Sequence, residues 1–278
     1  MTTQEDALPT QALLLADSFA TRFRPLTAEI PKVLMPLVNV PMLEYTLHFL
    51  ASGGMQEIIV ACSAHAETVR RYLDESPWLR GEVHKDVSVR VVSGNFAGVS
   101  DVLEALEDVL YPKRSFVLVT GDVVGNVPLR QLVRRHEDAL KQDPTLAMTV
   151  VLSRAPAGHR ARPRTDALCV AYTTDSASKL VAYDQVEHGT DKVARSVFPL
   201  STWVMESGSD VRLRGDLMDA HMYSQTHKSG RDIVHTVPTH AGTSAPTVWR
   251  NFSPVRSTGS TWTDTSFRDS CRARCFAR

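Results

Sequence analysis

Charged residues cluster after two segments of the sequence that are predicted to be buried strands. Arg22 and Lys32 follow the apolar run at residues 11–16, and Asp122 follows the run at residues 115–120. In parallel sheets, ligands bind beyond the carboxyl ends of the strands. We therefore expect a site for a charged ligand where residues 17–23 and 121–126 come together.

The remaining pattern predicts the elements that position these residues. Short apolar runs bounded by polar residues are typical of buried parallel strands, and apolar residues three and four apart indicate helices. The two patterns alternate, which predicts a doubly wound, mostly parallel α/β sheet of the Rossmann-like kind, covered on both faces. Strands are expected at 11–16, 57–62, 87–92, 115–120, 146–152, 167–172, 179–185 and 211–217, and helices at 41–52, 65–75, 99–110 and 128–141.

The composition excludes several classes of protein. The 278 residues contain 31 Lys and Arg against 31 Asp and Glu, so there is no global basic field for nucleic acid. No apolar run approaches the roughly 18–20 residues that a bilayer crossing requires. The N-terminus carries no signal-peptide pattern, and the four cysteines fit neither a zinc pattern nor a disulfide framework. We expect a cytoplasmic protein with no membrane partner and no direct contact with nucleic acid.

One segment carries a specific pattern. Its motifs are Arg24-Pro25-Leu26-Thr27, Pro31-Lys32 and Pro-Leu-Val-Asn-Val-Pro-Met-Leu from Pro36 to Leu43, and Val-Thr-Gly-Asp follows at residues 119–122. These motifs resemble those of sugar-phosphate nucleotidyltransferases, and the resemblance extends over roughly residues 10–225. It implies a nucleotidyltransferase-like fold. It also implies phosphate contacts for Arg22 and Lys32 and a metal-binding role for Asp122.

The loop after the first strand departs from that pattern. A loop that cradles a triphosphate needs glycines, because bare backbone N–H groups must approach the phosphates closely. The sequence has no glycine between residues 11 and 52 and carries Asp17-Ser18-Phe19 where the enzymes carry glycines. The Asp17 carboxylate would repel a polyanion. We therefore expect a pseudoenzyme domain with no catalytic residue and no cofactor.

A second resemblance follows from this departure. The motifs that carry it are Leu-x-Ala-Asp-Ser-Phe at 14–19, Ser-Asp-Val-Leu at 100–103, Gly-Asp-Val-Val-Gly-Asn at 121–126 and Asp-Leu-Met-Asp-Ala-His at 216–221. They resemble the epsilon subunits of translation initiation factor 2B, the guanine-nucleotide exchange factor for initiation factor 2. In this family a nucleotidyltransferase-like domain without its glycine-rich loop serves assembly and substrate binding. The resemblance implies the gamma subunit and the other subunits of the factor as partners, with initiation factor 2 as substrate of the full complex.

The composition changes near Gly230. Residues 230–278 contain no Leu, Lys or Glu but 14 Ser or Thr. Such a segment buries too little apolar surface to offset the conformational entropy that the chain loses when it becomes ordered. We expect a flexible N-terminus at 1–10, a nucleotidyltransferase-like domain at 11–229 and a low-order tail at 230–278. The family's exchange domain is not visible, and the break favours a truncated or frame-shifted gene model.

Other interpretations of these residues remain open. Asp122 could close a strand at a turn, Arg22 and Lys32 could be solvated cations, and Asp17-Ser18 could cap the following turn. His136, on the apolar face of its helix, is expected to be a packed histidine. The rival function is an active sugar-1-phosphate nucleotidyltransferase, similar to mannose-1-phosphate guanylyltransferases, which would use Mg²⁺ on Asp122 and an NTP.

Overall fold

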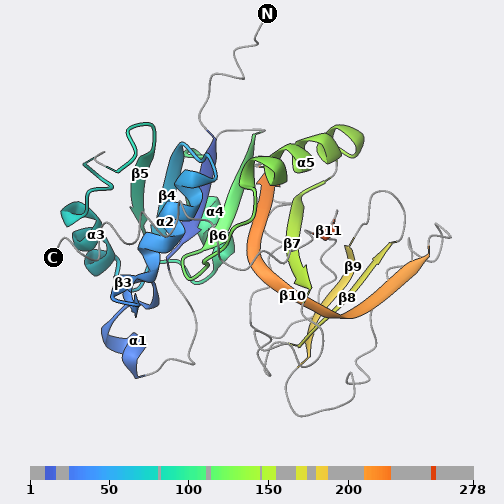
Figure 1. Ribbon diagram of the computed structural model, residues 1–278, viewed down its shortest axis with the longest axis horizontal. Coiled ribbons are helices and arrows are strands. Elements are labelled where there is room, and N and C mark those ends of the chain that lie inside the picture. The colour runs from blue at the N-terminus through green and yellow to red at the C-terminus, as the bar shows by residue number, and fades with distance from the viewer. Residues whose placement is uncertain are drawn as a thin grey trace, which may run out of the picture.

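The computed structural model describes residues 10–16, 25–80, 83–110, 114–144, 146–154, 167–173, 180–186, 210–226 and 252–254. The first half of the chain alternates strands with helices, as the apolar pattern predicts (Figure 1). Its elements are β1 (Gln11–Leu15), α1 (Leu26–Glu29), the 3₁₀ helix η3 (Lys32–Leu34), β2 (Pro36–Leu37), β3 (Val40–Pro41), α2 (Met42–Ser52), β4 (Glu57–Cys62), α3 (Ala66–Glu75), β5 (Ser88–Ser93), α4 (Val99–Ala105), β6 (Ser115–Thr120), α5 (Leu129–Gln142) and β7 (Met148–Arg154).

The second half of the chain adds strands to the same sheet. These are β8 (Ala167–Thr173), β9 (Leu180–Val186), β10 (Val211–Thr226) and β11 (Phe252–Pro254). The main path of the sheet is β11-β7-β10-β6-β1-β4-β5, with β8 paired to β10 and β9. Strands β6, β1, β4 and β5 run parallel, whereas β10 runs antiparallel to β6, β7 and β8. The predicted α/β fold with a mostly parallel central sheet is confirmed.

Helices cover both faces of this sheet. Side chains of α2, α3 and α5 pack against one face, where Leu14 and Val60 are completely buried. Side chains of α4 pack against the other face with Leu13 and Ile59. Neighbouring residues of β1 and β4 thus point to opposite faces and are both buried, as expected for strands enclosed in a parallel sheet.

Two elements differ from their predicted bounds by more than two residues. The helix expected at 99–110 ends at Ala105, because Leu106 leaves helical geometry, although turns up to Leu110 keep both leucines buried. The strand expected at 211–217 continues to Thr226, because it enters the sheet between β6 and β7 and bends at a bulge after Asp219. Polar residues such as Ser224 interrupt the apolar pattern there, so periodicity alone did not predict this part of the strand.

His136 is a packed histidine, as predicted. It is completely buried on α5 and lies 2.8 Å from Thr149 Oγ1 through Nδ1 and 2.8 Å from Thr226 Oγ1 through Nε2. Both ring nitrogens are therefore satisfied by hydroxyl groups, as a buried polar side chain requires. This network ties α5 to β7 and β10 and leaves His136 in a structural role.

The predicted domain limits remain largely predictions. Residues 1–9 lie outside the described residues, and so does the region after Thr226 apart from residues 252–254. Those three residues form β11, which pairs in parallel with β7. No helix in the described part of the chain combines the length and apolarity that a membrane crossing demands.

Candidate functional site

Lys32 lies at the start of a short 3₁₀ turn. Pro31, with φ −60° and ψ 140°, fixes the entry to η3, and its carbonyl accepts the N–H of Leu34 at 2.9 Å. Val33 is buried in this turn and holds it against the end of the central sheet. The tight turn therefore presents the Lys32 side chain toward the carboxyl end of β6.

Asp122 follows β6 directly, and Gly121 before it permits the close packing. A Cβ atom on Gly121 would lie 2.5 Å from Val33 Cγ1 and 3.1 Å from Leu14 Cδ2, so only glycine allows η3 to approach this closely. The Gly121 N–H also donates to Leu15 O at 2.8 Å. This bond fastens the turn to the neighbouring strand β1.

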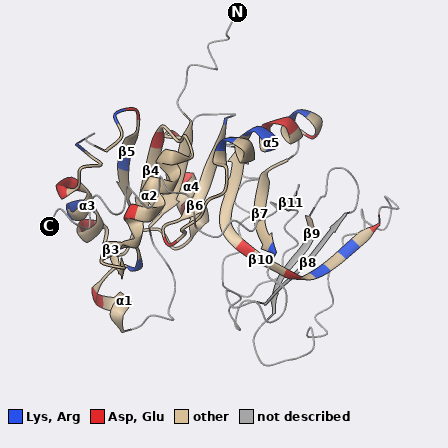
Figure 2. Ribbon diagram, viewed as in Figure 1, with Lys and Arg blue, Asp and Glu red and all other residues tan. Residues whose placement is uncertain are grey.

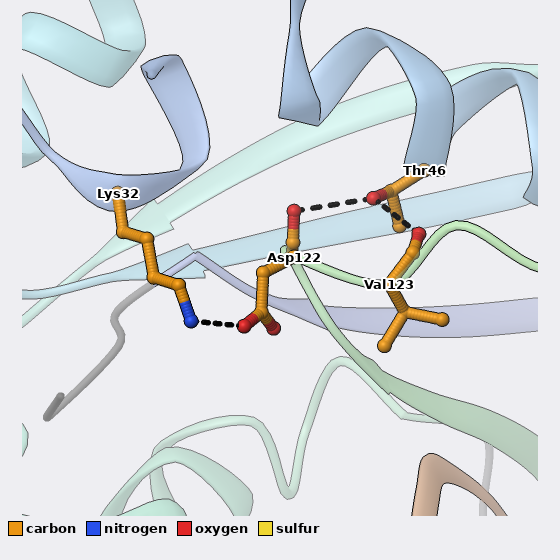
Figure 3. Close-up of polar contacts among 5 residues, drawn as sticks. Lys32, Thr46, Asp122 and Val123 are labelled. Atoms are coloured by element: carbon orange, nitrogen blue, oxygen red, sulfur yellow. Dashed lines mark hydrogen bonds and ion pairs between the residues drawn. The ribbon is translucent and has the colours of Figure 1, made fainter. Parts of the chain in front are cut away.

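Thr46 on α2 holds the same turn from the other side. Its hydroxyl is completely buried and lies 3.1 Å from Gly121 O and 2.9 Å from Val123 O (Figure 3). The two carbonyl oxygens that flank Asp122 thus point toward α2, while the Asp122 carboxylate points toward Lys32. Thr46 could not be predicted as a site residue, since a threonine in an amphipathic helix gives no signal of this contact.

Lys32 and Asp122 form an ion pair at the centre of the site. The Lys32 ammonium donates a hydrogen bond to Asp122 Oδ2 (Figure 3), and the two side chains are 16% and 26% exposed. The residues are 90 positions apart in sequence. The structure thus brings Lys32 and Asp122, the two predicted site residues that it describes, into direct contact.

The surroundings keep the Asp122 carboxylate ionised. Burial alone would raise the pKa of Asp122, but the hydrogen bond from Lys32, the neighbouring Thr120 hydroxyl and the charges of Lys32 and His221 outweigh it. The pKa of Asp122 therefore lies below its ordinary value of 3.8. Since this pKa is lower in the folded state, the pair stabilises the fold above pH about 4, and this contribution disappears as pH falls through the folded-state pKa.

Replacing Asp122 by Asn is therefore expected to destabilise the protein at neutral pH and to have a smaller effect in acid. A hydrogen bond to a charged group contributes about 1.5–3 kcal/mol, which sets the expected loss at pH 7. Denaturant unfolding between pH 7 and pH 3 measures it. Asp138→Asn, which removes the exposed partner of Lys141, is the matched control and should change little. A loss that stayed constant down to pH 3 would rule out the ion pair as its cause.

A strained bulge in β10 lies beside this pair. His221 has φ 53°, a left-handed conformation that is uncommon for residues other than glycine. Its backbone N–H donates to Asp219 Oδ1 at 2.7 Å, and the Tyr223 hydroxyl donates to Asp219 Oδ2 at 2.7 Å. Bulges of this kind re-aim side chains next to functional sites. Here the bulge places His221 near enough to Asp122 to contribute to the lowered pKa of that carboxyl.

The other predicted site residues cannot be placed. Arg22 lies outside the described residues, as do Asp17, Ser18 and Phe19 of the loop without glycines. In the described part of the chain, no three His, Cys, Asp or Glu side chains form a cluster that could hold a metal ion. The described site therefore consists of one carboxylate and one ammonium, positioned by Thr46 and Gly121.

Comparison with known proteins gives a consistent result. The family model described as "Nucleotidyl transferase" matches residues 11–159. The chain is 35% identical over 212 residues to translation initiation factor eIF2B subunit epsilon of Schizosaccharomyces pombe, covering 76% of this chain and 30% of that one. The same subunit of Dictyostelium discoideum is 34% identical over 221 residues, covering 78% and 29%. The chain thus spans about 30% of the length of these relatives.

Solved structures agree on the fold. A crystal structure of a UDP-glucose pyrophosphorylase with UDP-glucose matches with a TM-score of 0.52 and 13% identity, covering 79% of this chain and 76% of that one. At this identity the match shows the fold alone.

Proposed function

The chain belongs to the nucleotidyl transferase family, and from this premise we propose that it is a non-catalytic, epsilon-type domain of the exchange factor for translation initiation factor 2. Its role is assembly: it binds the gamma subunit, and through it the other subunits, in the cytoplasm. The full complex then acts on initiation factor 2. The similarity to two epsilon subunits over more than three quarters of this chain supports this assignment.

An exposed apolar surface on one segment carries the assembly role. We call residues 26–38 the apolar segment, and its exposed large apolar side chains are Leu26, Ile30, Leu37 and Val38. Val38 is 78% exposed and Leu26 is 58% exposed. The segment contains one acidic and one basic residue, Glu29 and Lys32, and its ribbon is otherwise uncharged (Figure 2). Exposed large apolar side chains gathered on one segment are typical of protein interfaces.

Two features support a non-catalytic role. The stretch between residues 11 and 52 has no glycine with which to cradle a triphosphate. In addition, Lys32 and Asp122, which a nucleotidyltransferase would need for phosphate and Mg²⁺ respectively, neutralise each other. Both charges would have to be released before either could serve catalysis.

Co-purification with the gamma subunit tests the proposal. We expect the chain to be poorly soluble by itself, because the apolar segment stays uncovered, and to be recovered in a stoichiometric complex when the gamma subunit is co-expressed. Size-exclusion chromatography with static light scattering measures both outcomes. A monodisperse monomer that does not associate with the gamma subunit would count against the assignment.

A further inference from the structure

The donor groups around Asp122 do not suit a divalent cation. Magnesium is bound by oxygen ligands in near-octahedral geometry and usually needs one or two carboxylates together with phosphates or waters. Asp122 supplies one carboxylate, and its Oδ2 already accepts the Lys32 ammonium. The flanking carbonyl oxygens of Gly121 and Val123 point toward the Thr46 hydroxyl. Within the described residues, no three His, Cys, Asp or Glu side chains form a cluster that could hold a metal ion.

The Lys32 ammonium, by contrast, is built into the fold at this position. Its backbone is fixed by Pro31 and by the buried Val33, which packs against Gly121. The Lys32 side chain is only 16% exposed, so Lys32 is not an ordinary solvated surface cation. A cation that belongs to the chain does not have to bind from solution. The entropic cost of placing it beside the carboxylate is already part of the free energy of folding.

We infer that the Lys32 ammonium takes, within the chain itself, the place of a divalent cation at Asp122. It joins η3 to the end of β6 as a bridging metal ion would, and it excludes Mg²⁺ from the carboxylate. This inference is independent of the assembly role, because the domain could bind its partners with either cation beside Asp122.

The inference predicts a specific response to magnesium. In Lys32→Met the side chain keeps most of its length but loses its charge, and the partly buried Asp122 carboxylate loses its ion-pair partner. Millimolar Mg²⁺ should then bind this carboxylate weakly and raise the melting temperature of the variant, measured in dilute solution, by about 2–4 °C. The wild type should not respond, and neither should Lys32→Met/Asp122→Asn. NaCl at matched ionic strength controls for screening.

Three results would overturn the inference. The first is a wild-type protein that gains as much from Mg²⁺ as Lys32→Met does. The second is a Lys32→Met variant that does not respond, and the third is a double variant that responds equally. Should Lys32→Met fail to fold, electron paramagnetic resonance of Mn²⁺ with the wild type decides the question. Wild type and Asp122→Asn should then show the same free Mn²⁺ signal, and a bound ion lost in Asp122→Asn would contradict the inference.

Discussion

Replacing Val38 by Asn should make the chain more stable and its complex with the gamma subunit weaker. Val38 and Asn39 form the tip of the β2–β3 hairpin with φ 51° and 67°, the positive values that a type I′ turn requires. A left-handed conformation costs an L-residue about 1–2 kcal/mol, and Asn tolerates it far better than a β-branched residue. The variant should therefore gain about 1 kcal/mol of unfolding free energy.

The effect on binding should have the opposite sign. Burying a Val side chain contributes about 1.5–3 kcal/mol, so losing it from an interface weakens the complex roughly 10- to 100-fold. Chemical denaturation of the dilute chain and competition between wild-type and variant chains for the co-expressed gamma subunit give the two values. Leu213→Asn is the matched control, because Leu213 is 57% exposed on β10, away from the apolar segment in Figure 1. An unchanged affinity for Val38→Asn would remove the tip of the hairpin from the interface.

The sequence predicted the enclosed part of the sheet well. The strands expected at 57–62 and 115–120 have those bounds in the structure, because short apolar runs between polar residues leave few alternatives. The helix α2 also ends where the Gly53-Gly54 pair predicts, since Gly53 caps the helix and Gly54 takes φ 87°. Local patterns of side-chain type were sufficient for these elements.

The sequence could not predict contacts between distant residues. Nothing local indicates that Lys32 and Asp122 pair, because the contact depends on Gly121 admitting Val33. The second half of β10 was missed for a similar reason. Some of its polar residues pair with side chains on other elements, as Thr226 does with His136 on α5.

The chain is also expected to catalyse no nucleotidyl transfer. Phosphoryl and nucleotidyl transfer depend almost entirely on positioning and on neutralising charge. The loop after β1 lacks glycines to bring backbone N–H groups to the phosphates, and Lys32 is bound to Asp122. Each missing charge-assisted contact is worth about 1.5–3 kcal/mol, so several of them together should lower the rate by orders of magnitude.

Pyrophosphate release is the measurement that tests this account most directly. The chain, co-expressed and purified with the gamma subunit as proposed above, is incubated with Mg²⁺, GTP and mannose-1-phosphate, and then with other pairs of NTP and sugar phosphate. Wild type and Asp122→Ala should both stay at background, while circular dichroism shows that both are folded. Turnover by the wild type that disappears in Asp122→Ala would contradict the account and identify the domain as an active nucleotidyltransferase.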